Sequence, residues 1–172
     1  MTPTKNGHPP SSMTHPGSER LLAAAFFLGP SAFGVDTAQI QEVVRVGTLT
    51  PVRHAPPYVV GIRNLRGRIV TVIDLRSRLE LGRVEPGPEN RILIVEASGE
   101  PIGLLVDRVS DTVEIDIAEL HAAPPNLNGV QGRHFRGICR GGDRMVALLD
   151  LTAVLQTEAE FTASAEREPG TA

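Results

Sequence analysis

The side chains that could carry out chemistry are few and widely spaced in this 172-residue chain. Its five histidines stand at positions 8, 15, 54, 121 and 134, and no pair has the i, i+4 spacing of metal ligands on one helix face. The single cysteine, Cys139, has no second thiol for a disulfide or a thiolate cluster. Arg136 and Arg140 flank it, but its predicted strand favours a buried, unreactive thiol. We therefore expect no metal and no cofactor.

Asp36 offers the one enzymatic alternative with some basis. Asp36-Thr37-Ala38 follows an apolar strand, and aspartic hydrolases pair two such carboxylates, one from each half of a pseudo-twofold β protein. The corresponding place in the second half reads Asp107-Arg108-Val109, which lacks the hydroxyl and adds a cation. The chain also has no phosphate loop, no GxGxxG after a strand and no Gly-x-Ser-x-Gly elbow. The sequence thus disfavours a hydrolase, and we expect no enzymatic activity.

Charge and hydropathy restrict the remaining classes. The net charge of −3 argues against a nucleic-acid-binding β-barrel, although six arginines lie between Gly61 and Arg83. Five phenylalanines and one tyrosine are too few to stack on single strands. No run approaches the roughly 18 apolar residues of a membrane span, and the lone cysteine fits a reducing compartment. The expected location is the cytoplasm, without membrane insertion.

The elements that must position these residues are mainly strands. Segments 1–18 and 157–172 are poor in large apolar residues and are expected to be disordered or flexible tails around a domain at 19–156. Between them, short apolar runs bounded by Gly, Pro and Asp predict strands. These runs are 22–28, 32–36, 69–74, 91–96, 101–107, 112–115, 132–139 and 145–150. Brief helical spacing appears at 37–43, after Asp74 and Asp150, and at 117–120.

An internal repeat is the strongest organisational signal. Residues 61–79 and 137–155 align without gaps at an offset of 76, with seven identities in 19 positions. In each copy a turn precedes a strand, and an aspartate, Asp74 or Asp150, closes that strand as a cap for a helical turn. A hairpin lies upstream of each copy. The repeat predicts an all-β protein with short helices, built as two pseudo-symmetric five-stranded barrels, since closure removes exposed sheet edges.

The segment 54–81 carries a resemblance to a known family. This segment resembles the chemotaxis coupling proteins of the CheW family in three successive features. These are Pro56-Pro57, then Gly61-Ile62-Arg63-Asn64-Leu65-Arg66-Gly67, then an apolar strand that ends in Asp74-Leu75. Family-like pieces extend the resemblance over about Glu19 to Gln156. One departure is Thr71, where the family usually has proline within the strand, which should alter an edge or a bulge but not the fold.

The resemblance implies two intertwined SH3-like barrels without catalysis. It also implies two partners, the cytoplasmic tip of methyl-accepting chemoreceptors and the regulatory domain of a CheA-type histidine kinase. The protein would then be a cytoplasmic adaptor recruited to receptor arrays at the inner face of the membrane. The alternative is a CheW-like scaffold of a non-flagellar pathway, with twitching or another output.

The resemblance further implies two contact surfaces. Receptor-binding candidates, near a groove between the barrels, are Ile40, Glu42, Arg66 and Val106. Kinase-binding candidates on the first barrel are Val59, Asn64, Leu65 and Gly67. The residue types of 64–67 suit a contact loop, because Asn and Gly tolerate left-handed turns while Leu and Arg provide an anchor and a forked donor. Alternatively, Arg66 holds its own turn to a nearby carboxylate.

Overall fold

The computed structural model describes residues 17, 19–127 and 129–156. Apart from Gly17, the segments expected to be tails, 1–18 and 157–172, lie outside these residues. Strands predominate in the described part, which contains no helix long and apolar enough to cross a membrane.

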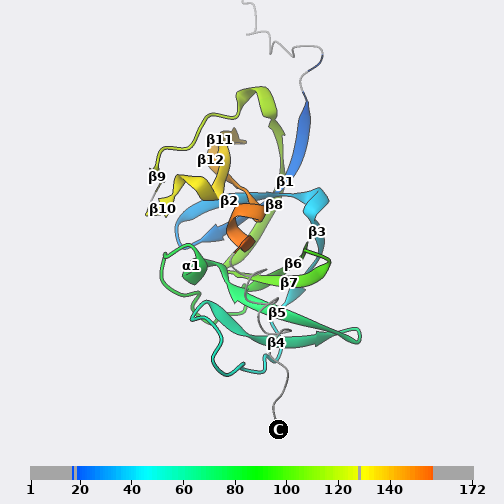
Figure 1. Cartoon of the computed structure of the whole chain (residues 1–172). Coiled ribbons are helices and arrows are strands. Elements are labelled where there is room, and N and C mark those ends of the chain that lie inside the picture. The colour runs from blue at the N-terminus through cyan, green and yellow to red at the C-terminus, as the bar shows by residue number, and fades with distance from the viewer. Residues whose placement is uncertain (1–16, 18, 128, 157–172) are drawn as a thin grey trace, which may run out of the picture.

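Ten strands form two five-stranded sheets, which lie in the upper and lower parts of Figure 1. Sheet A has the order β11-β12-β2-β1-β8, and sheet B has the order β3-β6-β7-β5-β4. The strands of sheet A are β1 Arg20–Leu28, β2 Ser31–Asp36, β8 Arg108–Asp116, β11 Phe135–Gly141 and β12 Arg144–Leu149. Those of sheet B are β3 Ile40–Arg45, β4 Val59–Leu65, β5 Arg68–Asp74, β6 Arg91–Ala97 and β7 Glu100–Val106. Neighbours are antiparallel except the parallel pairs β12–β2 and β5–β7.

The remaining elements are short. The strands β9 (Asn126–Leu127) and β10 (Val130–Gln131) pair with each other. Single helical turns are η1 (Thr37–Gln39), α1 (Leu75–Arg78), η2 (Ile117–Glu119) and η3 (Gly132–His134), and residues 151–156 are also helical. The expected all-β fold with short helices is confirmed.

The two sheets are built on one plan and exchange their hairpins. Read strand for strand, β11-β12-β2-β1-β8 corresponds to β4-β5-β7-β6-β3. The hairpin β1–β2, from the first half of the chain, lies in sheet A beside three strands of the second half. The hairpin β6–β7, from the second half, lies in sheet B beside three strands of the first. A half of the sequence is therefore not a barrel; each sheet needs strands from both halves.

The repeat has a packing explanation, because alternate residues of a strand face opposite sides. Val70 and Val72 pack inside the curl of sheet B, and their repeat counterparts Val146 and Leu148 pack inside sheet A. Ile73 and Leu149 instead join the largest core cluster, which lies between the sheets and includes Leu75, Leu79, Leu151 and Leu155 of the helical turns. The repeated residues thus form part of the core inside each curled sheet and part of the core between the two sheets.

The two repeat aspartates cap helices as expected. Asp74, which is 5% exposed, accepts hydrogen bonds from the amides of Ser77 (3.1 Å) and Val84 (2.9 Å). Asp150 accepts one from the amide of Ala153 (3.2 Å). The bonds from Ser77 and Ala153 satisfy amides that the first turn of a helix leaves free, whereas the bond from Val84 ties the loop after α1 to the same carboxylate. We call α1, η3 and residues 151–156, which lie between the sheets, the helical seam (Figure 1).

Some local expectations were wrong. Of the expected helical stretch 37–43, only η1 is helical, because the β-branched residues after Ile40 pair with β6 as strand β3. The start of the expected strand 132–139 is the turn η3. Strands β3 and β4 were not predicted. Thr71 lies in neither an edge strand nor a bulge, since it pairs with Ile62 on one side and Ile102 on the other.

Candidate protein interaction site

The β4–β5 hairpin ends in a two-residue turn, Arg66-Gly67, between the paired residues Leu65 and Arg68. Both turn residues have positive φ, 54° for Arg66 and 83° for Gly67. A left-handed backbone conformation was expected for Asn64 and Gly67, and of these two residues only Gly67 has it. Asn64 is a strand residue whose side chain accepts the Gly67 amide at 2.9 Å. This geometry holds Arg66 at the tip of the hairpin, although a left-handed non-glycine residue costs about 1–2 kcal/mol.

Arg66 forms a forked ion pair with Glu42 on β3. Its two terminal nitrogens lie 3.2 and 3.0 Å from the two carboxylate oxygens. The arginine side chain is 77% exposed and the glutamate side chain 26%. Since β3 and β4 are the two edge strands of sheet B, the pair spans the open side of the curled sheet.

Arg63 reinforces this closure, and sequence reasoning missed its role. Its guanidinium donates to the carbonyls of Arg45 and, at 3.0 Å, Val46, at the end of β3. No ladder joins β3 to β4 among the described residues, so arginine side chains bridge the two edges. The repeat could not reveal this, because the counterpart of Arg63 is Cys139. That thiol is buried, and burial raises its pKa, as expected for an unreactive cysteine.

The remaining predicted contact residues are unequally placed. Leu65 is half-buried and shares with Arg66 and Glu42 the lining of a cavity of about 300 Å³. Val59, at the other end of β4, lines a separate apolar cavity of about 740 Å³. Ile40 is half-buried at the start of β3 and packs on the core between the sheets. Val106 is 0% exposed in that core, so its side chain does not face a partner, contrary to expectation.

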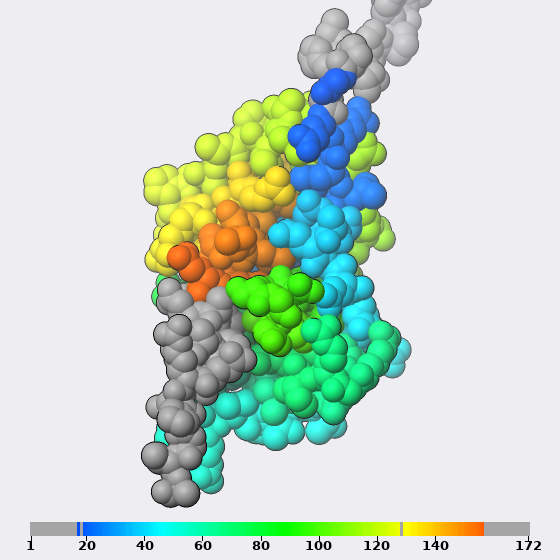
Figure 2. Space-filling view, turned by 45° about the vertical axis from the view of Figure 1, so that its right-hand side comes forward, coloured from blue at the N-terminus to red at the C-terminus, as the bar shows by residue number. Residues whose placement is uncertain are grey.

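A groove also lies beside the helical residues 151–156, and none of the receptor-binding candidates Ile40, Glu42, Arg66 and Val106 lines it. The helical residues 151–156 (orange) lie against the β6–β7 turn (bright green) on the surface in Figure 2. The groove between them has a volume of about 590 Å³ and is lined by Gln39, Glu96, Ala97, Ser98, Leu151, Thr152, Leu155 and Gln156.

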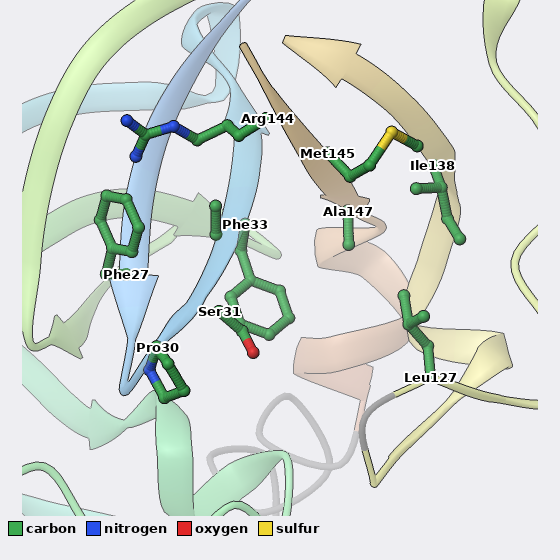
Figure 3. A pocket seen from close by; sticks show the side chains of 10 residues that line it. Phe27, Pro30, Ser31, Phe33, Leu127, Ile138, Arg144, Met145 and Ala147 are labelled. Atoms are coloured by element: carbon green, nitrogen blue, oxygen red, sulfur yellow. The ribbon is translucent and has the colours of Figure 1, made fainter.

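Sheet A has its own surface pocket of about 420 Å³, which the sequence did not predict (Figure 3). Phe27 forms one wall, with the guanidinium carbons of Arg108 and Arg144 at 3.7 and 5.0 Å from its ring centre. The neighbouring Met145 is 54% exposed, and its repeat counterpart Ile69 is 56% exposed. Both sheets therefore expose an arginine followed by an apolar residue at the start of equivalent strands, Arg68 and Ile69 in β5 and Arg144 and Met145 in β12.

The carboxylates of the hydrolase alternative are engaged in separate structural roles. Asp36 accepts the amide of Ala38 at 2.9 Å and lies 3.9 Å from Arg136. Asp107 accepts the amide of Gly29 at 2.5 Å and lies 3.6 Å from Arg76. Within the described part of the chain, no three His, Cys, Asp or Glu side chains are grouped to hold a metal. The fold defines a two-sheet β protein with an arginine exposed at a hairpin tip.

Comparison with known proteins identifies the family. The model of the CheW-like domain matches residues 23–159. Chemotaxis protein CheW of Rhizobium meliloti (strain 1021) is 30% identical over 146 residues, which are 85% of this chain and 92% of the relative. Protein FrzA of Myxococcus xanthus is 30% identical over 135 residues, 77% of this chain and 83% of the relative. The crystal structure of scaffolding protein TtCheW from Thermoanaerobacter tengcongensis has a TM-score of 0.73 at 30% identity, covering 88% of this chain and 94% of that one. The chain belongs to the CheW-like family, which makes it a chemotaxis adaptor.

Proposed function

We propose that this protein joins methyl-accepting chemoreceptors to the regulatory domain of a CheA-type histidine kinase, without catalysis of its own. Family membership supports the adaptor role. The observation that carries the proposal is the exposed Arg66–Glu42 fork at the hairpin tip, which presents a guanidinium already held in place for a partner. We place the protein in the cytoplasm, recruited to receptor arrays at the inner face of the membrane.

The receptor tip contacts Ile40, Glu42 and Arg66 in this proposal, and the kinase contacts Val59, Asn64, Leu65 and Gly67. Arg66 lies between Leu65 and Gly67 on one turn, so the two partner surfaces meet at the hairpin tip. Val59 at the far end of β4, with its apolar cavity, anchors the kinase side away from Glu42. The kinase surface thus runs along β4, and the receptor surface crosses from Arg66 to β3.

Replacement of Glu42 by Lys tests this division. A lysine opposite Arg66 places two cations together and releases the fork, so binding of a receptor cytoplasmic fragment should weaken while kinase binding is retained. Affinities for both partners are measured on the folded variant. The matched control is Glu114→Lys, which breaks the exposed Arg20–Glu114 pair of sheet A and should leave both affinities unchanged. Equal loss of both partners by folded Glu42→Lys would refute the division, and a wild-type chain that binds neither would refute the adaptor.

A CheW-like scaffold of a non-flagellar pathway is the second candidate, and the similarity to Protein FrzA is consistent with it. Deletion of the gene distinguishes the two. Loss of swimming chemotaxis assigns the flagellar pathway, whereas loss of directed surface movement with normal swimming assigns the alternative.

A further inference from the structure

His134 is one of three polar or charged side chains that are buried among the described residues, the others being Asp74 and Asn90. Asp74 and Asn90 both use their side chains in hydrogen bonds. His134 is 4% exposed, and neither of its ring nitrogens has a hydrogen-bond partner in the described part of the chain. An imidazole in this setting is held as a neutral ring, because a buried cation without a partner is costly.

The backbone of His134 joins the segments that lie between the two sheets. The His134 carbonyl accepts the amide of Asp150 at 2.8 Å, immediately before helical residues 151–156. In the other half, the Tyr58 carbonyl likewise accepts the amide of Asp74 at 2.7 Å, and Asp74 immediately precedes α1. Arg78 of α1 then ties the helical turns together by donating to the Val154 carbonyl at 3.0 Å, with its guanidinium 5.3 Å from the centre of the Tyr58 ring. These segments form the helical seam between the sheets in Figure 1.

The charges facing His134 come from both sides of the seam. Arg133 precedes it in η3, Arg78 belongs to α1, and Glu80 follows α1. Burial lowers the pKa of His134 most, the two arginines lower it further, and Glu80 opposes them. A proton on this ring would therefore meet a net positive surrounding inside the protein.

We propose that His134 makes the helical seam pH-sensitive, packing the two sheets together as a neutral ring and loosening their contact when it is protonated. The sign follows from linkage. A histidine whose pKa is lower in the folded than in the unfolded chain contributes stability at pH values above its unfolded pKa, which is ordinarily about 6.5. This stability is lost as the pH falls from that value toward the lower pKa of the folded state. In that window the unfolding equilibrium constant rises by up to about tenfold per pH unit.

Urea unfolding of the full chain from about pH 8 to about pH 5.5 tests the proposal. Wild-type protein should lose stability below about pH 6.5 more steeply than His134→Gln and His134→Phe, which carry no titrating ring. His121→Gln is the matched control, since His121 is exposed, and should follow the wild type. If His134→Gln keeps the full wild-type dependence on pH, the proposal is wrong.

A second measurement needs no variant to fold. NMR titration of the wild-type histidine rings should place the midpoint of His134 below the ordinary histidine value of about 6.5. The His134 midpoint should also coincide with a change in amide signals along α1 and residues 151–156. A His134 midpoint at or above about 6.5, or a titration that leaves the seam amides unmoved, overturns the assignment.

Discussion

Arg66 is held by one carboxylate across the sheet edge and is otherwise open to solvent. The sequence left two roles for it, a partner contact or a tie of its own turn to a nearby carboxylate. The structure shows such a carboxylate, Glu42, which belongs to β3 on the opposite edge of sheet B. An exposed pair of this kind contributes little to stability, typically under 1 kcal/mol, so the geometry favours the contact role.

Replacement of Arg66 separates the roles at the residue scale. Arg66→Ala keeps the Cβ and the turn, so we expect a change of under about 0.5 kcal/mol in the free energy of unfolding. Partner binding should weaken by more than about 1 kcal/mol, and Arg66→Lys should restore little because an ammonium lacks the planar fork. Melting temperature and both affinities are measured on the same variants, with Arg140→Ala on sheet A as the control for loss of one exposed arginine. A destabilised Arg66→Ala that binds normally once folded would exclude the contact role.

At the scale of elements, the two copies of the repeat share one backbone device. Gly61 and Gly137 each lie at a register shift of the strand pair that carries them. A Cβ on Gly61 would lie 2.6 Å from the Thr50 carbonyl oxygen, and one on Gly137 would lie 2.6 Å from that of His121. In both places the next residue exchanges two backbone hydrogen bonds with that approaching segment, at 2.8–2.9 Å. Glycine is needed at both sites to let the backbones approach.

Alanine at either glycine should therefore be costly. We expect Gly61→Ala and Gly137→Ala each to lower the free energy of unfolding by about 1–3 kcal/mol, since backbone must move to admit the methyl group. Gly87→Ala, where the nearest atoms lie 4.0 Å from the added Cβ, should change stability by less than about 0.5 kcal/mol. Denaturant titration of the three variants checks this. A harmless Gly137→Ala beside a damaging Gly61→Ala would contradict the equivalence of the two copies.

At the scale of the whole molecule, the exchange of hairpins makes the two sheets interdependent. A chain divided after Gly87 keeps the hairpin ladders β1–β2 and β4–β5 in its first part, and β6–β7 and β11–β12 in its second. The ladders that assemble the sheets, including β1–β8, β2–β12, β3–β6 and β5–β7, all join one part to the other. Isolated hairpins are marginally stable in water at best.

Fragments 19–87 and 88–156 should accordingly be unfolded alone and fold when mixed. Circular dichroism and amide NMR dispersion of each fragment, and of the equimolar mixture, measure this. A full chain cut once in the loop 85–89 is the control and should stay folded, because every ladder remains. Cooperative unfolding of either fragment by itself would show that a sequence half is an independent unit after all.

The sequence by itself determined much of the protein. Periodicity and turn residues predicted the β class, the hairpins 22–36 and 91–107 and the capping aspartates Asp74 and Asp150, because these depend on residues close in the chain. The repeat predicted two equivalent halves, and the family motifs predicted the adaptor. Strand β3 was misread because its pattern over a few residues fits a short helix as well, and pairing with β6 decides between them.

Tertiary structure alone decided which segments share a sheet and which side chains meet. Hairpin exchange depends on the ladders β1–β8 and β5–β7, between strands whose separation in the chain no local pattern encodes. Glu42 reaches Arg66, and Arg63 reaches Arg45, because sheet B curls until its edges face each other. Val106 and Ile40 look equally apolar in sequence, yet one is enclosed between the sheets and the other is half-exposed at a strand start. Burial is a property of the assembled sheets, so residue type could not assign these surfaces.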